Sequence, residues 1–303
     1  MKGIYADASG GLAEVFARVY QPDDPHVTVH EIDVILPEHM PGLYGGHDFI
    51  LNDHTFLPTE TMARIEGLKH IIFLGTGARS YMDVEGIEAL GLKVHTIRGY
   101  GDTAVGEHAI ALMWAAARNI SSLDRSIRAG GWPRGGAIQL TGKTLGLYGF
   151  GGIAAEVARI AAGSGMRVIA WNRSPRSYPG VEFVDLPTLL AESDVLSIHL
   201  LLTDETRHSL NAARIAAMKP GSILVNTARA GLVDTAAMIT ALKSGHIRHA
   251  GLDVFDAEPL APGDELTTLP NVTLTSHDGF NTPEASENLI RMGLDIARRL
   301  AQG

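Results

Sequence analysis

Three residues in the second half of the chain could together do acid–base chemistry on a small organic acid. They are Arg229, Glu258 and His277, and each lies in a short segment of its own. A guanidinium can pair with a carboxylate through two parallel hydrogen bonds and can also polarise a carbonyl oxygen. An imidazolium can give a proton to a developing alkoxide, and a carboxylate beside it keeps the ring charged.

A glycine-rich turn upstream of these residues indicates what could react with such an acid. The sequence G-F-G-G-I-A at 149–154 follows an apolar stretch and opens an amphipathic one. In such a turn Gly149 permits the tight bend, Gly151 lets the backbone approach a pyrophosphate, and Ala154 allows close helix packing. The pyrophosphate would bind free N–H groups at the helix N-terminus. The expected dinucleotide contacts here are Gly149, Gly151, Gly152 and Ile153. With Arg, Glu and His downstream, the turn indicates nicotinamide-dependent reduction of a 2-keto acid.

The elements that must position these groups form a regular series from residue 144 onwards. Six apolar stretches alternate with helical ones, which predicts a doubly wound parallel sheet. Ligands bind at the carboxyl ends of strands in such sheets, and the three candidate residues lie near strand ends. The predicted strands are 145–148, 167–171, 195–199, 222–226, 249–252 and 272–275; the predicted helices are 153–163, 186–192, 212–218 and 236–244.

The first hundred residues predict a second, smaller α/β unit with a parallel sheet. A last helix, 283–301, begins with a proline at a permitted first-turn position. We therefore expect an α/β protein of two Rossmann-like domains with a cleft between them. Residues 1–98 and 280–303 would bind substrate, and 99–279 would bind the dinucleotide. The predicted strands of the smaller unit are 4–6, 27–35, 49–51, 71–74 and 92–97, with helices at 59–66 and 82–90.

A long helix should begin at Asp102 or Thr103, either of which can cap it. Its body, 109–117, is apolar all round, so every side must be covered. A place between domains or across a subunit interface would cover it, and we expect a homodimer. His108 in this helix is interpreted as a core or interface residue.

Composition narrows the class of protein. The net charge is −9 and the sequence has no run of Lys or Arg, which argues against nucleic-acid and anionic-membrane partners. The chain has no cysteine, and its histidines lack metal-ligand spacing, so we expect no metal. The N-terminus lacks the apolar core of a signal peptide, and no apolar run approaches the ~20 residues that span a bilayer. A soluble, cytoplasmic protein is expected.

Several segments carry a family resemblance. The chain resembles the D-isomer-specific 2-hydroxyacid dehydrogenases, of glyoxylate or hydroxypyruvate reductase type, over about residues 70 to 300. The segments are E-H-A-I-A-L-M from Glu107, H-L-L-L-T-D-E-T-R-H from His199, V-N-T-A-R-A-G-L-V-D from Val225, G-L-D-V-F-D-A-E-P-L from Gly251 and L-T-S-H-D-G-F from Leu274.

The resemblance implies roles for particular residues. It makes Arg229 the carboxylate clamp, Glu258 the partner of the acid/base group and His277 that group. By the same resemblance Thr203, Thr227 and Asp253 lie near the cofactor. The backbone N–H groups of Gly75, Thr76 and Gly77 would hold the substrate carboxylate together with Arg229.

Leu201 stands where the family usually has proline. Two other departures from the family pattern concern the substrate pocket. His277 lies between Ser276 and Asp278 instead of following proline. The loop after Gly77 continues as 78–81, A-R-S-Y, where an Asp-Asn-like pair is usual. The substrate therefore stays open, with glyoxylate and hydroxypyruvate as the first candidates. The alternatives are a phosphite- or phosphoglycerate-type dehydrogenase, and a nucleotide-sensing interaction protein of corepressor type.

The segment after the predicted strand 167–171 bears on the choice of nicotinamide. An NAD enzyme usually has Asp or Glu about 20 residues past the glycines, to hold the ribose 2′-hydroxyl. Here Asn172 is neutral and would not repel a 2′-phosphate, while Arg173, Ser174 and Arg176 could donate to one. We expect NADP to be preferred; the alternative is an NAD enzyme in which Asn172 holds the hydroxyl.

Overall fold

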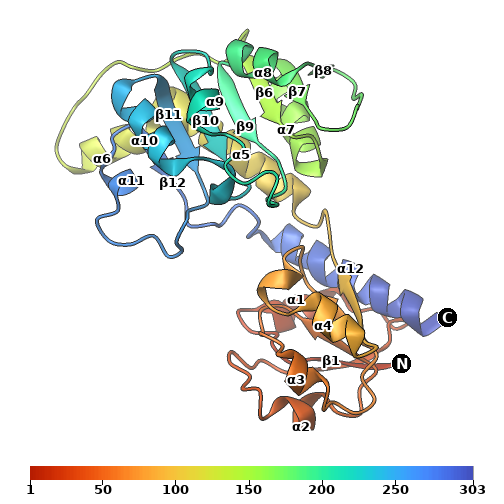
Figure 1. Ribbon diagram of the computed structural model, residues 1–303. Coiled ribbons are helices and arrows are strands. Elements are labelled where there is room, and N and C mark those ends of the chain that lie inside the picture. The colour runs from red at the N-terminus through yellow and green to blue at the C-terminus, as the bar shows by residue number, and fades with distance from the viewer. Residues whose placement is uncertain (303) are drawn as a thin grey trace. The chain divides into compact units, whose positions relative to one another are not determined.

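The computed structural model describes residues 1–302, which divide into two compact units (Figure 1). Unit 1 joins Met1–Gly101 with the C-terminal segment from Asn281. Unit 2 is the continuous stretch Asp102–Phe280. Each unit has its own parallel sheet and its own apolar clusters, so each can be described by itself.

Unit 2 is built on a seven-stranded sheet in the order β12-β11-β10-β9-β6-β7-β8, in which all pairs are parallel. The chain starts in the middle, at β6, runs outward to β7 and β8, and returns to the other side of β6 as β9. The direction of winding thus reverses between β6 and β9, and their carboxyl ends mark the usual ligand crevice of such sheets. The strands are β6 (Thr144–Tyr148), β7 (Arg167–Trp171), β8 (Glu182–Phe183), β9 (Val195–Ile198), β10 (Ser222–Asn226), β11 (Ile247–Leu252) and β12 (Val272–Leu274).

Helices cover both faces of this sheet (Figure 1). One apolar cluster joins the sheet to α5 (Asp102–Arg118) and α7 (Gly152–Gly163), and another joins it to α8 (Leu186–Glu192), α9 (Ala212–Ala216) and α10 (Thr235–Ser244). The strands are buried on both sides, which explains their continuous apolar sequences. The unit also contains α6 (Ile120–Arg128), α11 (Glu265–Thr268) and the 3₁₀ turn Ala230–Leu232.

Unit 1 has a five-stranded parallel sheet in the order β2-β1-β3-β4-β5. Its last helix comes from the far end of the chain: α12 (Pro283–Gln302) packs beside α1 (Leu12–Val19), as Figure 1 shows. The strands are β1 (Lys2–Tyr5), β2 (His26–Val29), β3 (Phe49–Asn52), β4 (His70–Phe73) and β5 (Lys93–Thr96). The other helices are α2 (Met40–Tyr44), α3 (Thr59–Met62) and α4 (Val84–Ala89), with a 3₁₀ turn at Ala78–Ser80.

The structure corrects several predicted elements. The strand predicted at 27–35 ends at Val29, because β2 is an edge strand that pairs only with the short β1. The helix predicted at 59–66 is only the single turn α3. Four helices, α1, α2, α6 and α11, and the two-residue strand β8 were not predicted. The elements α2, α11 and β8 are too short to show a period, whereas α1 and α6 were overlooked although their apolar residues have helical spacing.

The expectation about what covers the long apolar helix also needs correction. Residues Ala109, Met113 and Ala116 of α5 are buried within unit 2, where the helix packs on α7, β10 and β11. The helix therefore has a covered apolar face without any second subunit, and its composition alone does not require one. Within residues 1–302, no helix combines the length and the apolar character needed to cross a bilayer.

Candidate functional site

His277 and Glu258 form a hydrogen-bonded pair. The His277 Nδ1 lies 2.7 Å from Glu258 Oε2, and both side chains are about one-third exposed. The other carboxylate oxygen, Oε1, accepts from the Phe255 N–H at 2.9 Å, which fixes the orientation of the carboxylate. Because Nδ1 donates to an anion, the second ring nitrogen, Nε2, is the one available to exchange a proton with a substrate.

The loop that carries His277 is held by hydrogen bonds to Asp253, at the carboxyl end of β11. Its Oδ1 accepts from Thr275 Oγ1 at 2.5 Å and from the Asp278 N–H at 3.0 Å, and its Oδ2 accepts from the Gly279 N–H at 3.0 Å. Burial opposes ionisation of Asp253, but these hydrogen bonds and that of His108 outweigh it and lower its pKa to about 2. The anchor is therefore an anion over the whole neutral range.

The backbone at His277 needs this anchor. His277 has φ 57°, in the left-handed region that residues other than glycine seldom occupy. Such a conformation persists only where the surroundings determine it, and the bonds from Asp253 to the next two residues do so here. The imidazole is in this way aimed at Glu258.

His108 is a second support of the same loop. From α5 its Nε2 reaches Thr275 Oγ1 at 2.8 Å and lies 3.3 Å from the Asp253 carboxylate. The interpretation of His108 as a core or interface residue leaves out that the ring ties α5 to the loop of His277. No local sequence signal links the two residues, since they come together only when α5 packs across β11 and β12.

Arg229 projects from a turn that is built by a buried asparagine. Asn226, at the end of β10, accepts the Ala228 N–H through Oδ1 and donates through Nδ2 to the Arg229 carbonyl, both at 3.0 Å. The Arg229 side chain is exposed, and one guanidinium N–H donates to the Ala228 carbonyl at 2.6 Å. The guanidinium has further donors that could pair with a carboxylate. In the sequence Asn226 is visible only as part of a motif, and its role in shaping the turn that carries Arg229 was not predicted.

The glycine turn has the geometry of an anion-binding helix start. Gly149 has φ 97°, and a Cβ there would lie 2.8 Å from the backbone of His199, so only glycine fits. Gly151 precedes the first turn of α7, and nothing lies within 4 Å of where its Cβ would be. Gly152 and Ile153 open the helix with free N–H groups, the arrangement that favours a phosphate.

Two threonines that follow strands β9 and β10 differ in what they can offer. Thr227 follows β10 and is buried, and its Oγ1 has no hydrogen-bond partner within residues 1–302. A buried hydroxyl without a partner is costly, so a bound polar group would complete this site. Thr203 lies after β9, and its Oγ1 donates to Glu205 Oε2 at 2.6 Å. The dinucleotide expected from the sequence fits the residues that surround Thr227.

The turn after β7 joins the glycine turn through Asn172. Its Oδ1 accepts the Phe150 N–H at 3.2 Å, and its Nδ2 donates to the Ser174 carbonyl at 2.8 Å. The amide is thus already bonded in both directions. Arg173 and Arg176 are exposed, and neither forms an ion pair with any of residues 1–302.

The loop expected to hold the substrate carboxylate belongs to unit 1. Gly75, Thr76 and Gly77 follow the carboxyl end of β4, and Gly75 has φ 154°. Arg79, in the 3₁₀ turn that follows, forms an ion pair with Glu85. Its guanidinium is therefore engaged within its own unit.

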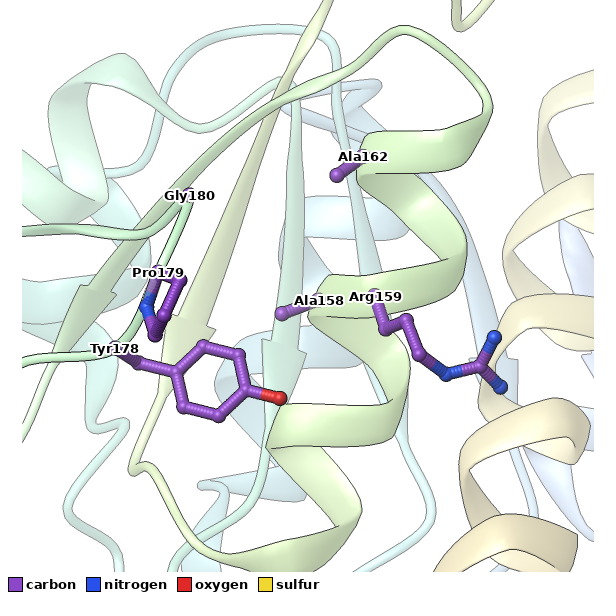
Figure 2. Close-up of a pocket in the computed structure, with 6 residues that line it drawn as sticks. All are labelled: Ala158, Arg159, Ala162, Tyr178, Pro179 and Gly180. Atoms are coloured by element: carbon purple, nitrogen blue, oxygen red, sulfur yellow. The ribbon is translucent and has the colours of Figure 1, made fainter.

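A surface pocket of about 380 Å³ lies elsewhere (Figure 2). Figure 2 shows the Tyr178 ring turned towards α7 near Ala158, with Pro179 and Gly180 on the same side and Arg159 and Ala162 on the helix. The lining residues from α7 belong to the middle and end of that helix, beyond the glycine turn. Within the described part of the chain, no group of three or more His, Asp or Glu side chains is placed to hold a metal ion.

Comparison with known proteins shows the family of the chain. A family model described as "D-isomer specific 2-hydroxyacid dehydrogenase, NAD binding domain" matches residues 110–279. The chain is 36% identical over 294 residues to a hydroxypyruvate reductase of Thermotoga maritima, covering 95% of this chain and 90% of that one. It is 40% identical over 235 residues to a glyoxylate reductase of Aeropyrum pernix, covering 73% and 70%.

Solved structures show the same fold over the full length. A D-2-hydroxyisocaproate dehydrogenase superimposes with a TM-score of 0.90 at 25% identity, covering 98% of this chain and 96% of that one. A D-lactate dehydrogenase with NAD⁺ from Lactobacillus jensenii gives 0.85 at 26% identity, covering 100% and 97%. Fold and sequence together define a dehydrogenase of two Rossmann-like sheets. The chain belongs to the D-isomer-specific 2-hydroxyacid dehydrogenase family and is an NAD(P)-dependent oxidoreductase. The resemblance, the fold class and the enzymatic nature expected from the sequence are confirmed.

Proposed function

We propose that the protein reduces a small 2-keto acid, of glyoxylate or hydroxypyruvate type, to the D-2-hydroxy acid. The observation that carries this proposal is the contact of 2.7 Å between His277 Nδ1 and Glu258 Oε2. It gives the imidazole one nitrogen held by an anion and one free to donate a proton. The two relatives described above, named as reductases of these two acids, support the choice of substrate.

The residues divide the work as follows. Reduced nicotinamide, when bound, supplies a hydride to C2 of the keto acid. Arg229 pairs with the carboxylate and polarises the carbonyl. The backbone N–H groups of Gly75, Thr76 and Gly77 stay a predicted part of substrate binding. His277 gives the Nε2 proton to the carbonyl oxygen as the C–O double bond becomes single, and Glu258 stabilises the imidazolium before transfer. A general acid of this kind is worth about 10²–10⁴ in rate.

The test is a panel of 2-keto acids, followed by the loss of reduced-nicotinamide absorbance, with glyoxylate, hydroxypyruvate, pyruvate and 3-phosphohydroxypyruvate. Reduction of the first two with the highest kcat/KM supports the proposal. A preference for the phosphorylated acid, or for oxidation of phosphite, would replace the substrate. Binding of NAD(H) without any turnover would favour a nucleotide-sensing role instead.

We further propose that NADPH is the preferred donor. Asn172 adds no negative charge near the ribose, and the unpaired Arg173 and Arg176 can meet a 2′-phosphate. In this arrangement Gly149, Gly151, Gly152 and Ile153 hold the diphosphate, while Ser174, Thr203, Thr227 and Asp253 belong to the surrounding pocket. A tenfold preference in kcat/KM, about 1.4 kcal/mol, is expected, and Arg173→Ala should reduce it. Equal or better use of NADH by the parent would contradict the preference.

We propose a homodimer whose interface lies at α6 and not at the long helix α5, where the sequence led us to expect it. None of the residues of α6 is buried, although Ile120 and Ile127 are large and apolar, and Trp132 in the segment after α6 is 78% exposed. Exposed apolar side chains gathered in one short region are typical of contacts between subunits. Light scattering of the parent should give twice the chain mass, and Ile127→Asp should halve it. A parent that runs as a monomer at micromolar concentration would exclude this dimer.

A further inference from the structure

Asp102 holds a carboxylate against the helix start where the dinucleotide's diphosphate is proposed to bind. It is the first residue of α5 and is half-buried. A Cβ added to Gly152 would lie 1.7 Å from Asp102 Oδ2 and 2.6 Å from its Cγ. Gly152 is the first residue of α7, so the carboxylate occupies the space beside the first turn of that helix.

The position of Asp102 is fixed by close packing of the two helices. One turn further along α5, a Cβ on Gly106 would lie 2.9 Å from Glu156 Cβ and 3.5 Å from the Ile153 carbonyl. Residues four apart on a helix share a face, so Asp102 and Gly106 both face α7. This crossing leaves the Asp102 carboxylate little freedom to turn away from Gly152.

Burial and the charged side chains around Asp102 do not favour its anionic form. Burial raises its pKa, and the carboxylate of Glu156 on α7 raises it further. The other charged side chain on this part of α7 is Arg159, which is paired with Glu156 at 2.9 Å. On its own helix the nearest acidic residue is the exposed Glu107. A second anion at the same helix start would also repel the Asp102 carboxylate.

We propose that Asp102 determines the affinity of the glycine turn for dinucleotides, by placing a negative charge beside the diphosphate and so weakening its binding. The inference rests on the proposed dinucleotide site. The charge of Asp102 acts on the diphosphate, which NADH and NADPH share. It therefore lowers the affinity for both donors alike. Binding of either donor is linked to protonation of Asp102 and is tighter at low pH. A weak hold on the cofactor favours its release after each turnover.

The experiment measures binding of NADH and NADPH separately, by titration calorimetry, to the parent, to Asp102→Asn and to Asp124→Asn, between pH 5 and pH 8. Asp124 lies on α6 in the same unit, with an exposed carboxylate paired to Arg128, and provides the same change of charge and shape away from the turn. Thermal unfolding confirms that each variant is folded, and Asp102→Ser serves if the Asn variant is not.

At pH 8 Asp102→Asn should bind both dinucleotides on the order of tenfold more tightly than the parent. The parent Kd should rise with pH over the acidic part of the range, and the rise should vanish in Asp102→Asn and persist in Asp124→Asn. An unchanged or weaker Kd in folded Asp102→Asn would overturn the inference while leaving the enzyme's proposed function intact. Failure of the parent to bind either dinucleotide would instead overturn the proposed function. A gain for NADPH alone would also contradict the inference, because the diphosphate is common to both donors.

Discussion

At the scale of single residues, His277 and Glu258 have separable parts in the proposed reaction. His277→Ala removes the proton donor and nothing that holds the dinucleotide. We expect kcat to fall by about 10²–10⁴ with the Kd for NADPH unchanged. Steady-state kinetics and a direct binding titration measure the two quantities. A fall of less than threefold in kcat would remove His277 from the acid/base role.

Glu258→Gln tests the pair by its pH dependence. The amide keeps the shape but has only one acceptor oxygen for the Phe255 N–H and the His277 Nδ1–H, and the imidazolium loses its anionic partner. The upper pH limit for reduction should therefore move to lower pH, while the rate at the new optimum stays within about tenfold of the parent. The pH profile of kcat/KM is the measurement, and an unchanged profile would contradict the assignment of Glu258.

Arg229→Lys keeps the positive charge and removes the planar two-pronged donor. Both KM and kcat should suffer, because the carboxylate is held less well and the carbonyl is no longer polarised. Kinetics with glyoxylate give both numbers, and Arg214→Lys, away from this turn and bonded to Ser209 and Tyr148, is the matched control. If Arg229→Lys behaves like the parent, the clamp is another arginine.

At the scale of elements, the loop after β12 depends on Asp253. Asp253→Asn keeps the shape but replaces one acceptor oxygen by an NH₂ group facing backbone donors. The misplaced His277 should lower kcat by about 10²-fold, since small shifts of a catalytic group are costly. The exchange should also reduce the free energy of unfolding by about 1–3 kcal/mol.

The readout that separates positioning from simple instability is kcat measured well below the unfolding temperature, together with KM. A merely structural role would lower the unfolding temperature and leave kcat of the folded enzyme intact. Because the pKa of Asp253 is about 2, the anchor does not titrate above about pH 4, and the loss in Asp253→Asn should be independent of pH from 5 to 9. Asp124→Asn again provides the matched control.

At the scale of the whole molecule, one buried carboxylate joins the two ends of the chain. Asp24 accepts hydrogen bonds from Arg291 at 2.6 and 2.8 Å and from Arg298 at 2.7 Å. Helix α12 is therefore held to the N-terminal part of unit 1 by charge as well as by apolar packing. Burial opposes ionisation of Asp24, yet the hydrogen bonds from Arg291, the Gln21 N–H and Arg298 prevail and lower its pKa from 3.8 to about 2.

The direction of the pH effect follows from that shift. A carboxylate whose pKa is lower in the folded state stabilises the fold fully above its unfolded pKa, and the contribution is lost as the pH falls through the folded pKa. The contribution, about 2 kcal/mol, should be present above about pH 4 and disappear towards pH 2. Asp24→Asn should cost about 2–4 kcal/mol at pH 7, measured by urea unfolding. The neighbouring Asp23→Asn, with a side chain that is 67% exposed, should cost less than 0.5 kcal/mol. Equal losses in both variants would contradict the role of Asp24.

The sequence by itself determined the class of enzyme and the architecture of unit 2. Strands β7 and β10 and helix α8 have the predicted bounds, because buried parallel strands and amphipathic helices leave strong periodic signals. Arg229, Glu258 and His277 could be selected because their residue types and their places after strands are visible along the chain. The two-residue strand β8 is too short to leave a periodic pattern and was not visible in this way.

What only the tertiary structure decided are the contacts between segments far apart in the sequence. The hydrogen bond from His108 to Thr275, the carboxylate of Asp102 against Gly152 and the bonds from Arg291 to Asp24 each join residues from different elements. Strand register and helix crossing bring these side chains within a few ångströms, and no local spacing encodes either. The residue types that could do the proposed chemistry are thus visible in the sequence. The contacts that position them, and the carboxylate beside the first turn of α7, arise only when the chain has folded.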